Sequence, residues 1–333
     1  MPRNIIIIGG VATGPKTAAR LRRLDPEANI TVIERQDLLS YAGCGMPYYI
    51  EDVIKEWNDL LGGASIRDAA YFKANRGFTV LDQTEAKKIN RFAKLVTAED
   101  LRTGDVKDMP YDKLVLGTGA RPFVPKMEGT ELRGVHRLYN PHHAKDIKAA
   151  VDMGAKKVVV VGGGLIGLES CGAFVARGCE VSVIEMMPTI VSNLLDPEMA
   201  YLLENYLTRK GVNIVKGSPV ARMIDDGSGC VKAVETADGR VIEADLVVLS
   251  SATEPAENAE LMRKLKIPRD ESGFVKEFHQ KIRPTDTMVK NVFVCGAAQG
   301  PKDIPDTIAQ AGSAASSVVS YLGDGYVWLN PMI

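Results

Sequence analysis

The sequence is poor in residues arranged to hold a metal ion. Its five cysteines include no Cys-x-x-Cys pair, and its four histidines show no spacing typical of metal ligands. This pattern indicates neither a zinc site nor an iron–sulfur cluster, and we expect no metal. The odd number and scattered positions of the cysteines also argue against a framework of structural disulfides.

The sequence also lacks long apolar runs and an excess of charge of either sign. The apolar run that begins at Ile5 is too short for a signal peptide or a membrane span, so we expect a cytoplasmic protein. A net charge of −1 provides no electrostatic attraction for nucleic acid or for an anionic membrane. The content of 45% hydrophobic and 25% charged residues is ordinary for a globular protein, and 333 residues fit two domains.

The chain does contain one pattern twice: an apolar run, a group of glycines and, further on, a glutamate. The first copy reads Ile5-Ile6-Ile7-Ile8-Gly9-Gly10-Val11-Ala12-Thr13-Gly14, with Glu34 lying 25 residues after Gly9. The second copy reads Val158-Val159-Val160-Val161-Gly162-Gly163-Gly164-Leu165-Ile166-Gly167, with Glu185 lying 23 residues after Gly162. Each apolar run predicts a buried parallel strand, and each glutamate ends a second strand, 29–33 or 180–184.

This pattern is typical of dinucleotide-binding βαβ units. The glycines allow a tight turn and a close approach to a pyrophosphate, which the amides at the start of the following helix bind. The glutamate then accepts hydrogen bonds from ribose hydroxyls. The second copy is complete, whereas the first has Val11 in place of the middle glycine. The alternative for each copy is a glycine-containing turn without a ligand.

A solitary cysteine follows the first unit, in Ser40-Tyr41-Ala42-Gly43-Cys44-Gly45-Met46-Pro47-Tyr48-Tyr49. Proline suits the first position of a helix, so we expect a helix to start at Pro47, where its dipole would favour a Cys44 thiolate. The thiolate is the reactive form of cysteine. The alternative is that Cys44 is a small buried apolar residue. Cys171 and Cys179 favour core packing, and for Cys295, at the end of a predicted strand, a second redox role stays open.

The remaining sequence predicts an α/β fold in which the second nucleotide unit is inserted into the first. Residues 77–116 alternate apolar and polar side chains, which indicates a small element of antiparallel strands that includes 79–81 and 113–116. Further predicted elements are helices at 15–24, 142–153, about 197–210 and 307–321, strands within 212–249, and a strand at 292–294. A linker at 123–134 separates the two nucleotide units.

These motifs together resemble the FAD-dependent pyridine nucleotide–disulfide oxidoreductases over essentially the whole chain. The resemblance is strongest to the single-cysteine branch, which contains coenzyme A disulfide reductases, persulfide reductases and NADH oxidases. It depends on the segment around Cys44, on Gly117-Thr118-Gly119-Ala120-Arg121-Pro122, and on Gly162 to Glu169. The resemblance implies two Rossmann-like domains, an FAD domain of residues 1–119 and 250–333 and an NAD(P)H domain of residues 120–249.

The resemblance also implies which residues contact the cofactors. Cys44 is the implied catalytic residue, and Glu169 lies at the helix position that contacts nicotinamide. We expect NADH rather than NADPH, because Glu185 would repel a 2′-phosphate and Met186-Met187 provide no arginine to bind it. The residues implied in cofactor binding are Gly9, Val11, Ala12, Gly14, Glu34, Arg35, Ser40, Ala86, Thr118, Gly119, Gly162, Gly164, Leu165, Ile166, Gly167, Glu169, Glu185, Gly296, Ala297, Pro305, Thr307 and Ile308.

The chain departs from the family pattern near its end. In place of the usual Gly-Asp pair, residues 295–306 are similar to the end of heterodisulfide reductase flavin subunits. The usual C-terminal dimerisation domain has no counterpart before Ile333. Whether the chain forms a homodimer or joins other protein subunits therefore stays open.

Three functional hypotheses follow. The first is an NADH-dependent flavoprotein that reduces a small disulfide, persulfide or polysulfide through Cys44. The second is a flavin subunit that transfers electrons within a larger redox complex. The third is an NADH oxidase in which Cys44 cycles through a sulfenate. A nucleotide-binding protein without catalysis would leave the placed thiol unexplained.

Overall fold

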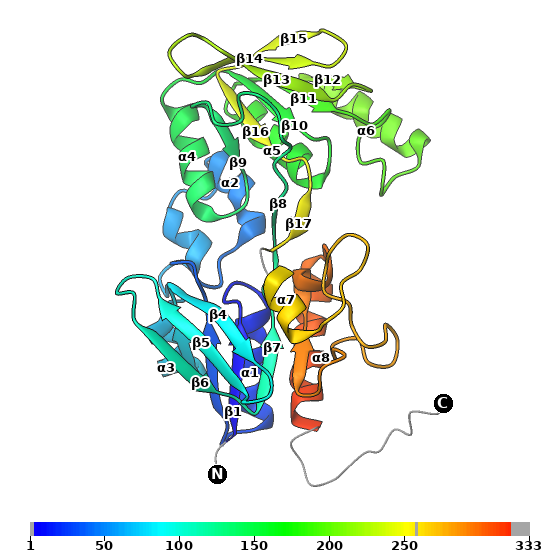
Figure 1. Cartoon of the computed structure of the whole chain (residues 1–333). Coiled ribbons are helices and arrows are strands. Elements are labelled where there is room, and N and C mark those ends of the chain that lie inside the picture. The colour runs from blue at the N-terminus through cyan, green and yellow to red at the C-terminus, as the bar shows by residue number, and fades with distance from the viewer. Residues whose placement is uncertain (1–2, 257–258, 321–333) are drawn as a thin grey trace. The chain divides into compact units, whose positions relative to one another are not determined.

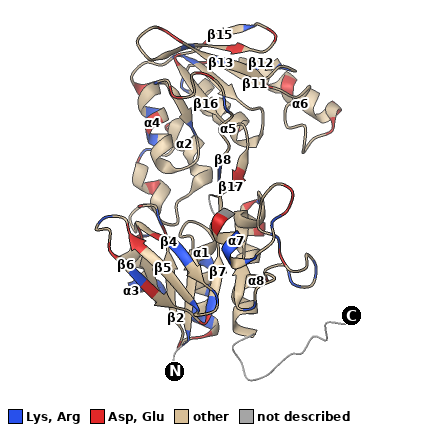
Figure 2. Ribbon diagram, in the orientation of Figure 1, with Lys and Arg blue, Asp and Glu red and all other residues tan. Residues whose placement is uncertain are grey.

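The computed structural model describes residues 3–256 and 259–320, which form two compact units (Figure 1). The first unit takes the described parts of residues 1–41, 64–121 and 254–333, and the second takes residues 42–63 and 122–253. Figure 2 shows lysine and arginine interspersed with aspartate and glutamate along the ribbons of both units. No helix among the described residues is both long and apolar enough to cross a membrane.

The first unit is built on a five-stranded parallel sheet in the order β18-β7-β1-β2-β3. The strands are β1 (Asn4–Ile8), β2 (Asn29–Ile33), β3 (Thr79–Leu81), β7 (Lys113–Leu116) and β18 (Val292–Val294). Apolar residues that alternate along these strands fill a separate core on each face. Ile5, Ile7 and Phe293 pack with the helices, whereas Ile6, Leu114 and Val294 pack under the antiparallel strands.

Helices cover one face of this sheet and a three-stranded meander covers the other. The helical face carries α1 (Thr13–Leu24), α3 (Ala69–Arg76) and α8 (Ile304–Ser320), and small side chains such as Ala314 let α8 pack closely against α1. The meander consists of β4 (Thr84–Asn90), β5 (Leu95–Asp100) and β6 (Val106–Pro110), and α7 (Ala259–Leu265) packs beside it. The predicted last helix is thus confirmed as α8, and Tyr321 lies outside the described residues.

One prediction about this unit is wrong in part. The antiparallel strands predicted within residues 77–116 exist as β4, β5 and β6, but β3 and β7 belong to the parallel sheet. All four residues of β7 are buried, including Lys113. Alternation within a short strand cannot show the direction of its partner, because the partner of β7 is β1, more than 100 residues earlier.

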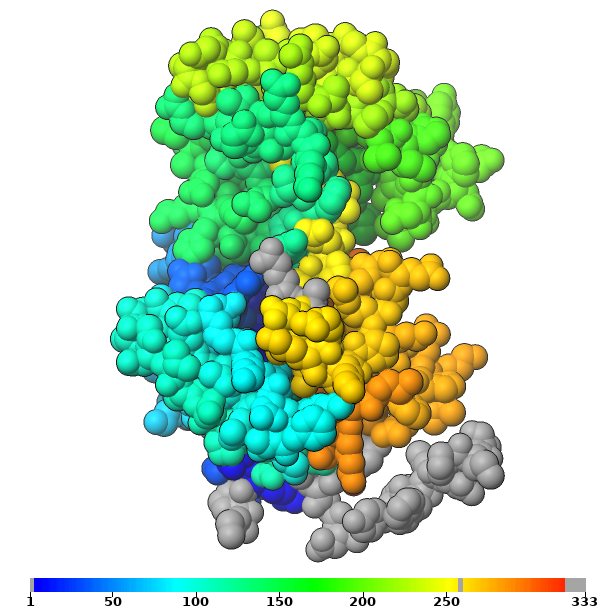
Figure 3. Space-filling view, in the orientation of Figure 1, coloured from blue at the N-terminus to red at the C-terminus, as the bar shows by residue number. Residues whose placement is uncertain are grey.

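The second unit repeats this three-layer arrangement. Its parallel sheet has the order β12-β11-β10-β16-β9. The strands are β9 (Val135–Arg137), β10 (Lys157–Val161), β11 (Glu180–Glu185), β12 (Val212–Lys216) and β16 (Leu246–Leu249). The antiparallel strands β13 (Val220–Asp225), β14 (Val231–Thr236) and β15 (Val241–Glu243) pack on one face, where Figure 3 shows them as the yellow-green layer.

Helices α4 (Pro141–Asp152), α5 (Leu165–Ala176) and α6 (Pro197–Arg209) pack on the other face of this sheet. Phe174 of α5 is fully buried there, and burial of a side chain of this size contributes about 1.5–3 kcal/mol. The predicted start of α4 is supported by Asn140, whose side chain accepts a hydrogen bond from the His143 amide. Asp196 occupies the N-cap position of α6 but makes no such bond.

The segment 42–63 packs in the second unit. It contains the 3-10 turns η1 (Gly43–Gly45) and η2 (Trp57–Leu61), with the short helix α2 (Met46–Ile50) between them. Met46, Tyr49 and Ile50 are buried in the same core as α4 and α5. We expected these residues in the first domain because they follow its βαβ unit in the sequence. A short two-stranded sheet of β8 (Ala120–Pro122) and β17 (Thr253–Pro255) forms where the chain passes between the units' residue ranges.

Candidate dinucleotide and thiol sites

Four of the predicted binding segments meet at one edge of the first unit's sheet. Gly9, Glu34, Gly117 and Cys295 each directly follow one of the neighbouring parallel strands β1, β2, β7 and β18. Backbone hydrogen bonds join them: the Gly9 amide donates to Ile33 O, and the Gly117 amide donates to Ile8 O, both at 2.8 Å. The carboxyl edge of a parallel sheet is where open α/β folds bind ligands.

The glycines of the first fingerprint are required by close backbone contacts. A Cβ atom on Gly14 would lie 1.7 Å from Gly9 O, and one on Gly9 would lie 2.0 Å from Gly117 O. Gly9 also has a φ of +117°, which side chains of L-residues rarely adopt. These contacts bring the start of α1 against the end of β1, so that the amides of the first turn of α1 face the edge where a pyrophosphate would bind.

Glu34 is held by backbone amides at the same edge. Its carboxylate accepts hydrogen bonds from the Gly10 amide at 2.6 Å and from the Gln36 amide at 2.9 Å. The residue is 7% exposed, and this burial raises the pKa of the carboxyl group, although the bonds from Gln36 and Gly10 act in the opposite direction. A carboxylate has about four acceptor positions, so two remain for hydroxyl donors of a ribose.

The second unit repeats this geometry. The Gly162 amide donates to Ile184 O at 2.8 Å, and Glu185 accepts hydrogen bonds from the amides of Gly163 (2.7 Å) and Met187 (2.8 Å). A Cβ atom on Gly167 would lie 2.2 Å from Gly162 O. The two copies therefore agree in hydrogen bonding and in close contacts, as well as in sequence.

The agreement extends past the glutamates. The Ser40 amide donates to Gly10 O, and the Val191 amide donates to Gly163 O; each donor lies six residues after its glutamate and has a φ of +47°. A non-glycine residue in this region of φ is uncommon and is typical of functional sites. Ser40 was predicted to contact a cofactor, and its backbone conformation is now seen to belong to the repeated fold.

The departure at Val11 is explained by the second copy. A Cβ atom on Gly164, the equivalent of Val11, would contact no protein atom within 4 Å. A side chain at this position therefore strains nothing within the protein. Both edges fit a dinucleotide, since each combines glycines whose replacement would clash, helix amides and an acceptor carboxylate. Gly164 leaves an approach for a pyrophosphate, and the neighbouring side chains of Leu165 and Ile166 are exposed.

The other predicted cofactor residues fall into three places. Arg35, Ala86, Thr118, Gly119, Ala297, Pro305, Thr307 and Ile308 lie in the first unit, and exposed Glu169 lies on α5 in the second. Pro305, Thr307 and Ile308 form the first turn of α8, where Pro305 and Ile308 are exposed. Ala86 lies in β4 of the meander, away from the strand ends that carry the fingerprint, and is half-buried.

Sequence reasoning did not identify Thr13 and Gln310. Cβ atoms on Gly117 and Gly296 would lie 2.8 Å and 2.3 Å from atoms of Thr13, so this buried side chain joins three of the segments. Gln310 of α8 accepts a hydrogen bond from the Gly296 amide at 2.8 Å. A threonine inside the fingerprint could have been noticed, whereas no local pattern indicated Gln310.

Cys44 lies in η1, and its side chain is exposed. The hypothesis that it packs as a small apolar residue is therefore wrong. The helix expected from Pro47 is α2, which begins at Met46 and has only five residues. Few peptide dipoles are aligned in so short a helix, so the helix-dipole contribution that we expected at Cys44 is small.

The other cysteines have different surroundings. Cys171 and Cys295 are fully buried, which raises their pKa to about 12 and about 11, and Cys179 is also buried. Cys171 donates to Gly167 O within α5. Burial and the raised pKa argue against a redox role for Cys295, because little of the thiol is ionised at neutral pH.

These environments predict selective alkylation. We expect iodoacetamide at pH 8 to modify Cys44 in the folded protein at least about tenfold faster than Cys171 and Cys295, because the thiolate reacts and access is needed. Peptide mass spectrometry after timed quenching measures this. All five cysteines should react in denaturant, and comparable rates for Cys44 and Cys295 in the folded protein would contradict the prediction.

Glu185 predicts the choice of coenzyme. Replacing Glu185 with alanine should remove an acceptor for the adenosine ribose hydroxyls and a repulsion toward a 2′-phosphate. We expect the ratio of kcat/KM for NADPH to that for NADH to rise about tenfold or more, and to rise further when Met186→Arg is added. Steady-state kinetics measure the ratio, with Glu180→Ala, at the exposed start of β11, as control. A wild-type preference for NADPH would contradict the assignment.

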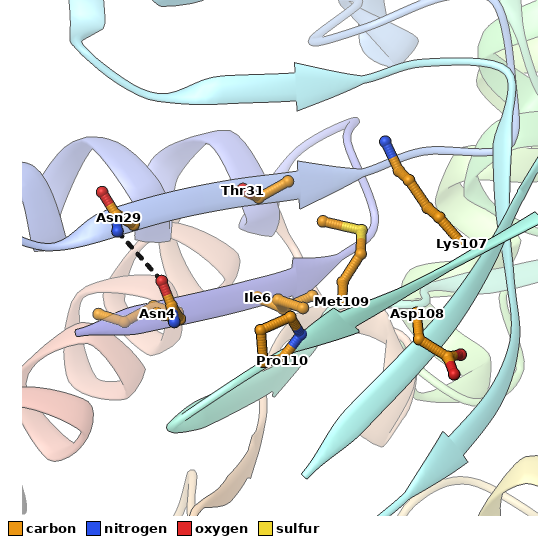
Figure 4. A pocket seen from close by; sticks show the side chains of 9 residues that line it. Asn4, Ile6, Asn29, Thr31, Lys107, Asp108, Met109 and Pro110 are labelled. Carbon is orange, nitrogen blue, oxygen red and sulfur yellow. Dashed lines mark hydrogen bonds between the residues drawn. The ribbon is translucent and has the colours of Figure 1, made fainter. Parts of the chain in front are cut away.

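One cavity of about 240 Å³ lies elsewhere in the first unit (Figure 4). It is lined by Asn4 and Asn29 at the beginnings of β1 and β2, and by Lys107 and Met109 of β6. This is the opposite end of β1 from Gly9. We therefore assign no cofactor to it.

A family model described as pyridine nucleotide-disulphide oxidoreductase matches residues 3–315. The chain belongs to this family. An NADH oxidase of Methanocaldococcus jannaschii is 32% identical over 294 residues, which are 87% of this chain and 62% of that protein. The chain thus spans about three fifths of the length of such relatives.

Two further comparisons place this member of the family. The structure of an NAD-dependent persulfide reductase from A. fulgidus superposes with a TM-score of 0.85 at 35% identity, covering 97% of this chain and 60% of that one. A protein of Archaeoglobus profundus that is named for its likeness to a heterodisulfide reductase polypeptide is 44% identical over 128 residues, which are 37% of this chain and 18% of that protein. The expected Rossmann-like α/β fold and the family resemblance are confirmed.

Proposed function

We propose that this chain is an oxidoreductase that passes electrons from NADH through FAD to a small disulfide, persulfide or polysulfide bound at Cys44. The observation that carries the proposal is the exposed Cys44 thiol in a chain with two dinucleotide edges of matching geometry. Free cysteines at all five positions are in keeping with a reducing, cytoplasmic setting. The similarity to a persulfide reductase supports the substrate class.

In this proposal the first unit holds FAD and the second holds NADH. Gly9, Gly14 and Glu34 would hold the FAD pyrophosphate and ribose, and Gly162, Gly167 and Glu185 the corresponding groups of NADH. FAD, when bound, supplies a two-electron acceptor for hydride and a donor of electrons to sulfur. The protein supplies the binding contacts, the close packing of the helix starts and the reactive thiol.

Cys44 would act as the nucleophile toward sulfur. Its thiolate attacks one sulfur of a substrate R–S–S–R, forms the Cys44–S–S–R bond and releases the other half as R–S⁻, which takes a proton from water. With a persulfide R–S–SH, attack on the outer sulfur leaves a Cys44 persulfide and releases R–S⁻. Two electrons from NADH then return Cys44 to the thiolate and release the bound sulfur as a thiol or sulfide.

The direct test uses the purified full chain loaded with FAD. Anaerobic titration with NADH should bleach the flavin spectrum, and later addition of inorganic polysulfide should restore it with release of sulfide. Flavin that NADH reduces but polysulfide does not reoxidise would contradict the proposal. Reoxidation by oxygen alone, at a rate that matches turnover, would instead favour an NADH oxidase, the activity named for the M. jannaschii relative.

A second candidate is a flavin subunit that transfers electrons to another protein. The 44% identity to the heterodisulfide reductase-like protein of A. profundus favours it, because that stretch covers 37% of this chain. In this case a protein acceptor should be reduced at the same rate by wild type and by a variant without the Cys44 thiol. Loss of transfer in the variant would exclude this candidate.

A further inference from the structure

We propose that Arg177 is a positioning residue for Cys44, acting through the short helix α2, and that Lys148 supports it through Asp52. The inference rests on the proposed function, because it concerns the orientation of the thiol that this function requires. All the residues concerned belong to the second unit. None of them was indicated by a sequence motif.

The first observation is a hydrogen bond from Arg177 to the end of α2. Arg177 is the C-cap residue of α5, the helix that begins at the second fingerprint, and its Nη1 donates to Ile50 O at 2.9 Å. Ile50 is the last residue of α2 and is fully buried. The last carbonyls of a helix have no partner within the helix, and a bond from a guanidinium satisfies this one.

The second observation is a chain of ion pairs that continues from Arg177. Arg177 also pairs with Asp152 at the end of α4, Lys148 Nζ lies 3.3 Å from Asp152 Oδ2, and the same Nζ lies 3.2 Å from Asp52 Oδ1. Lys148 and Arg177 are largely shielded from solvent, with side chains 13% and 21% exposed. The ion pairs thus link α5, α4 and the residue that follows α2.

Asp52 and its surroundings suit this role. The residue has a φ of +77°, so the chain turns sharply where α2 ends. Hydrogen bonds from Lys55 and Lys148 lower the pKa of Asp52 to about 2, which keeps the carboxylate ionised at neutral pH. The Lys148 ammonium also lies 5.8 Å from the centre of the Tyr49 ring, on the buried side of α2.

The far end of the segment is held at a second place on α4. Trp57 Nε1 donates to Pro141 O at 3.2 Å, and the rings of Trp57 and His142 lie 5.6 Å apart. The cysteine segment is therefore anchored at both ends of the stretch that follows α2. In α2 itself, Met46, Tyr49 and Ile50 face the core, whereas Cys44 and Tyr48 are exposed.

A five-residue helix cannot hold its own orientation, because an isolated helix of this length is unstable. The direction of the Cys44 thiol is therefore set by what fixes α2 to α4 and α5. Displacement of a reacting group by about 1 Å can cost roughly a hundredfold in rate. Loss of the Arg177 contact should thus affect the sulfur reaction more than the reactions that precede it.

The test compares Arg177→Met, Arg177→Lys and Lys148→Met with a matched control, Arg222→Met. Arg222 forms an ion pair with Glu235 on the β13–β14 hairpin of the same unit, at 2.6 Å. Each FAD-loaded variant is assayed for NADH-driven reduction of polysulfide and, separately, of ferricyanide, which needs no thiol. Amide hydrogen exchange of residues 46–54 reports on α2 directly and does not depend on any activity.

We expect Arg177→Met to lower kcat for polysulfide about tenfold and to change ferricyanide reduction less than about twofold. Exchange in residues 46–54 should accelerate about tenfold or more, because its protection depends on the contacts that hold α2. Arg177→Lys should recover part of the polysulfide rate, Lys148→Met should show a smaller loss, and Arg222→Met should behave as wild type.

Three results would overturn the inference. Equal losses of polysulfide and ferricyanide turnover in Arg177→Met would indicate a general structural role. Unchanged exchange in residues 46–54 would show that Arg177 does not hold α2. Full polysulfide turnover in both Arg177→Met and Lys148→Met would show that Cys44 needs no such support. Failure of the proposed function appears differently, as wild-type polysulfide turnover that does not depend on Cys44.

Discussion

Replacing Cys44 with serine is expected to lower the turnover of polysulfide and small disulfides about a thousandfold or more, because a serine hydroxyl stays protonated at neutral pH and cannot take up sulfur. NADH-driven reduction of ferricyanide should change less than about twofold, since the residues that would hold both dinucleotides are untouched. The measurement is steady-state turnover with each acceptor under anaerobic conditions, at equal flavin content.

The matched control is Cys230→Ser, which makes the same atomic change at a half-buried thiol on the β13–β14 hairpin. It should leave both activities at wild-type levels. If Cys44→Ser keeps full turnover with every sulfur acceptor, the thiol mechanism is wrong and the electron-transfer role becomes the better assignment. If it loses ferricyanide reduction as well, the substitution has damaged the fold rather than the chemistry.

Replacing Gly14 with alanine should produce the other large effect, loss of the bound flavin together with loss of stability. The added Cβ would lie 1.7 Å from Gly9 O, and a backbone carbonyl cannot move aside as a flexible side chain can. The start of α1 would have to shift away from β1, at a cost of about 2–3 kcal/mol or more in the free energy of unfolding. Gly14 has no positive φ among the described residues, so the effect isolates the close contact from backbone strain.

Thermal unfolding and the ratio of flavin to protein absorbance measure this result. Gly172→Ala is the matched control: Gly172 lies inside α5, and a Cβ there would contact no other atom within 4 Å. Because alanine favours helix over glycine, we expect this control to raise the free energy of unfolding by about 0.5–1 kcal/mol and to keep the flavin. A Gly14→Ala protein with full flavin content and unchanged stability would refute the assignment of this edge.

Much of the fold could be predicted from the sequence because its signals are local. The runs Ile5–Ile8 and Val158–Val161 indicated buried parallel strands, and β2 was predicted at its observed bounds. The paired glycines and Glu34 and Glu185 indicated two equivalent units, and the amides of Gly10 and Gly163 bind these carboxylates in the same way. That these edges bind FAD and NADH stays a prediction.

The sequence by itself determined the two βαβ units and the presence of a thiol between them, because strand period, glycine turns and helix starts depend on residues that are neighbours in the chain. Only the tertiary structure decided that β3 and β7 are parallel strands, that Cys295 is shielded, and that the Cys44 segment packs with α4 and α5. These outcomes depend on contacts such as Arg177 with Ile50, 127 residues apart, and Thr17 with Cys295, 278 residues apart. Burial and hydrogen bonding of this kind are properties of the assembled core, so no local pattern of residues could specify them.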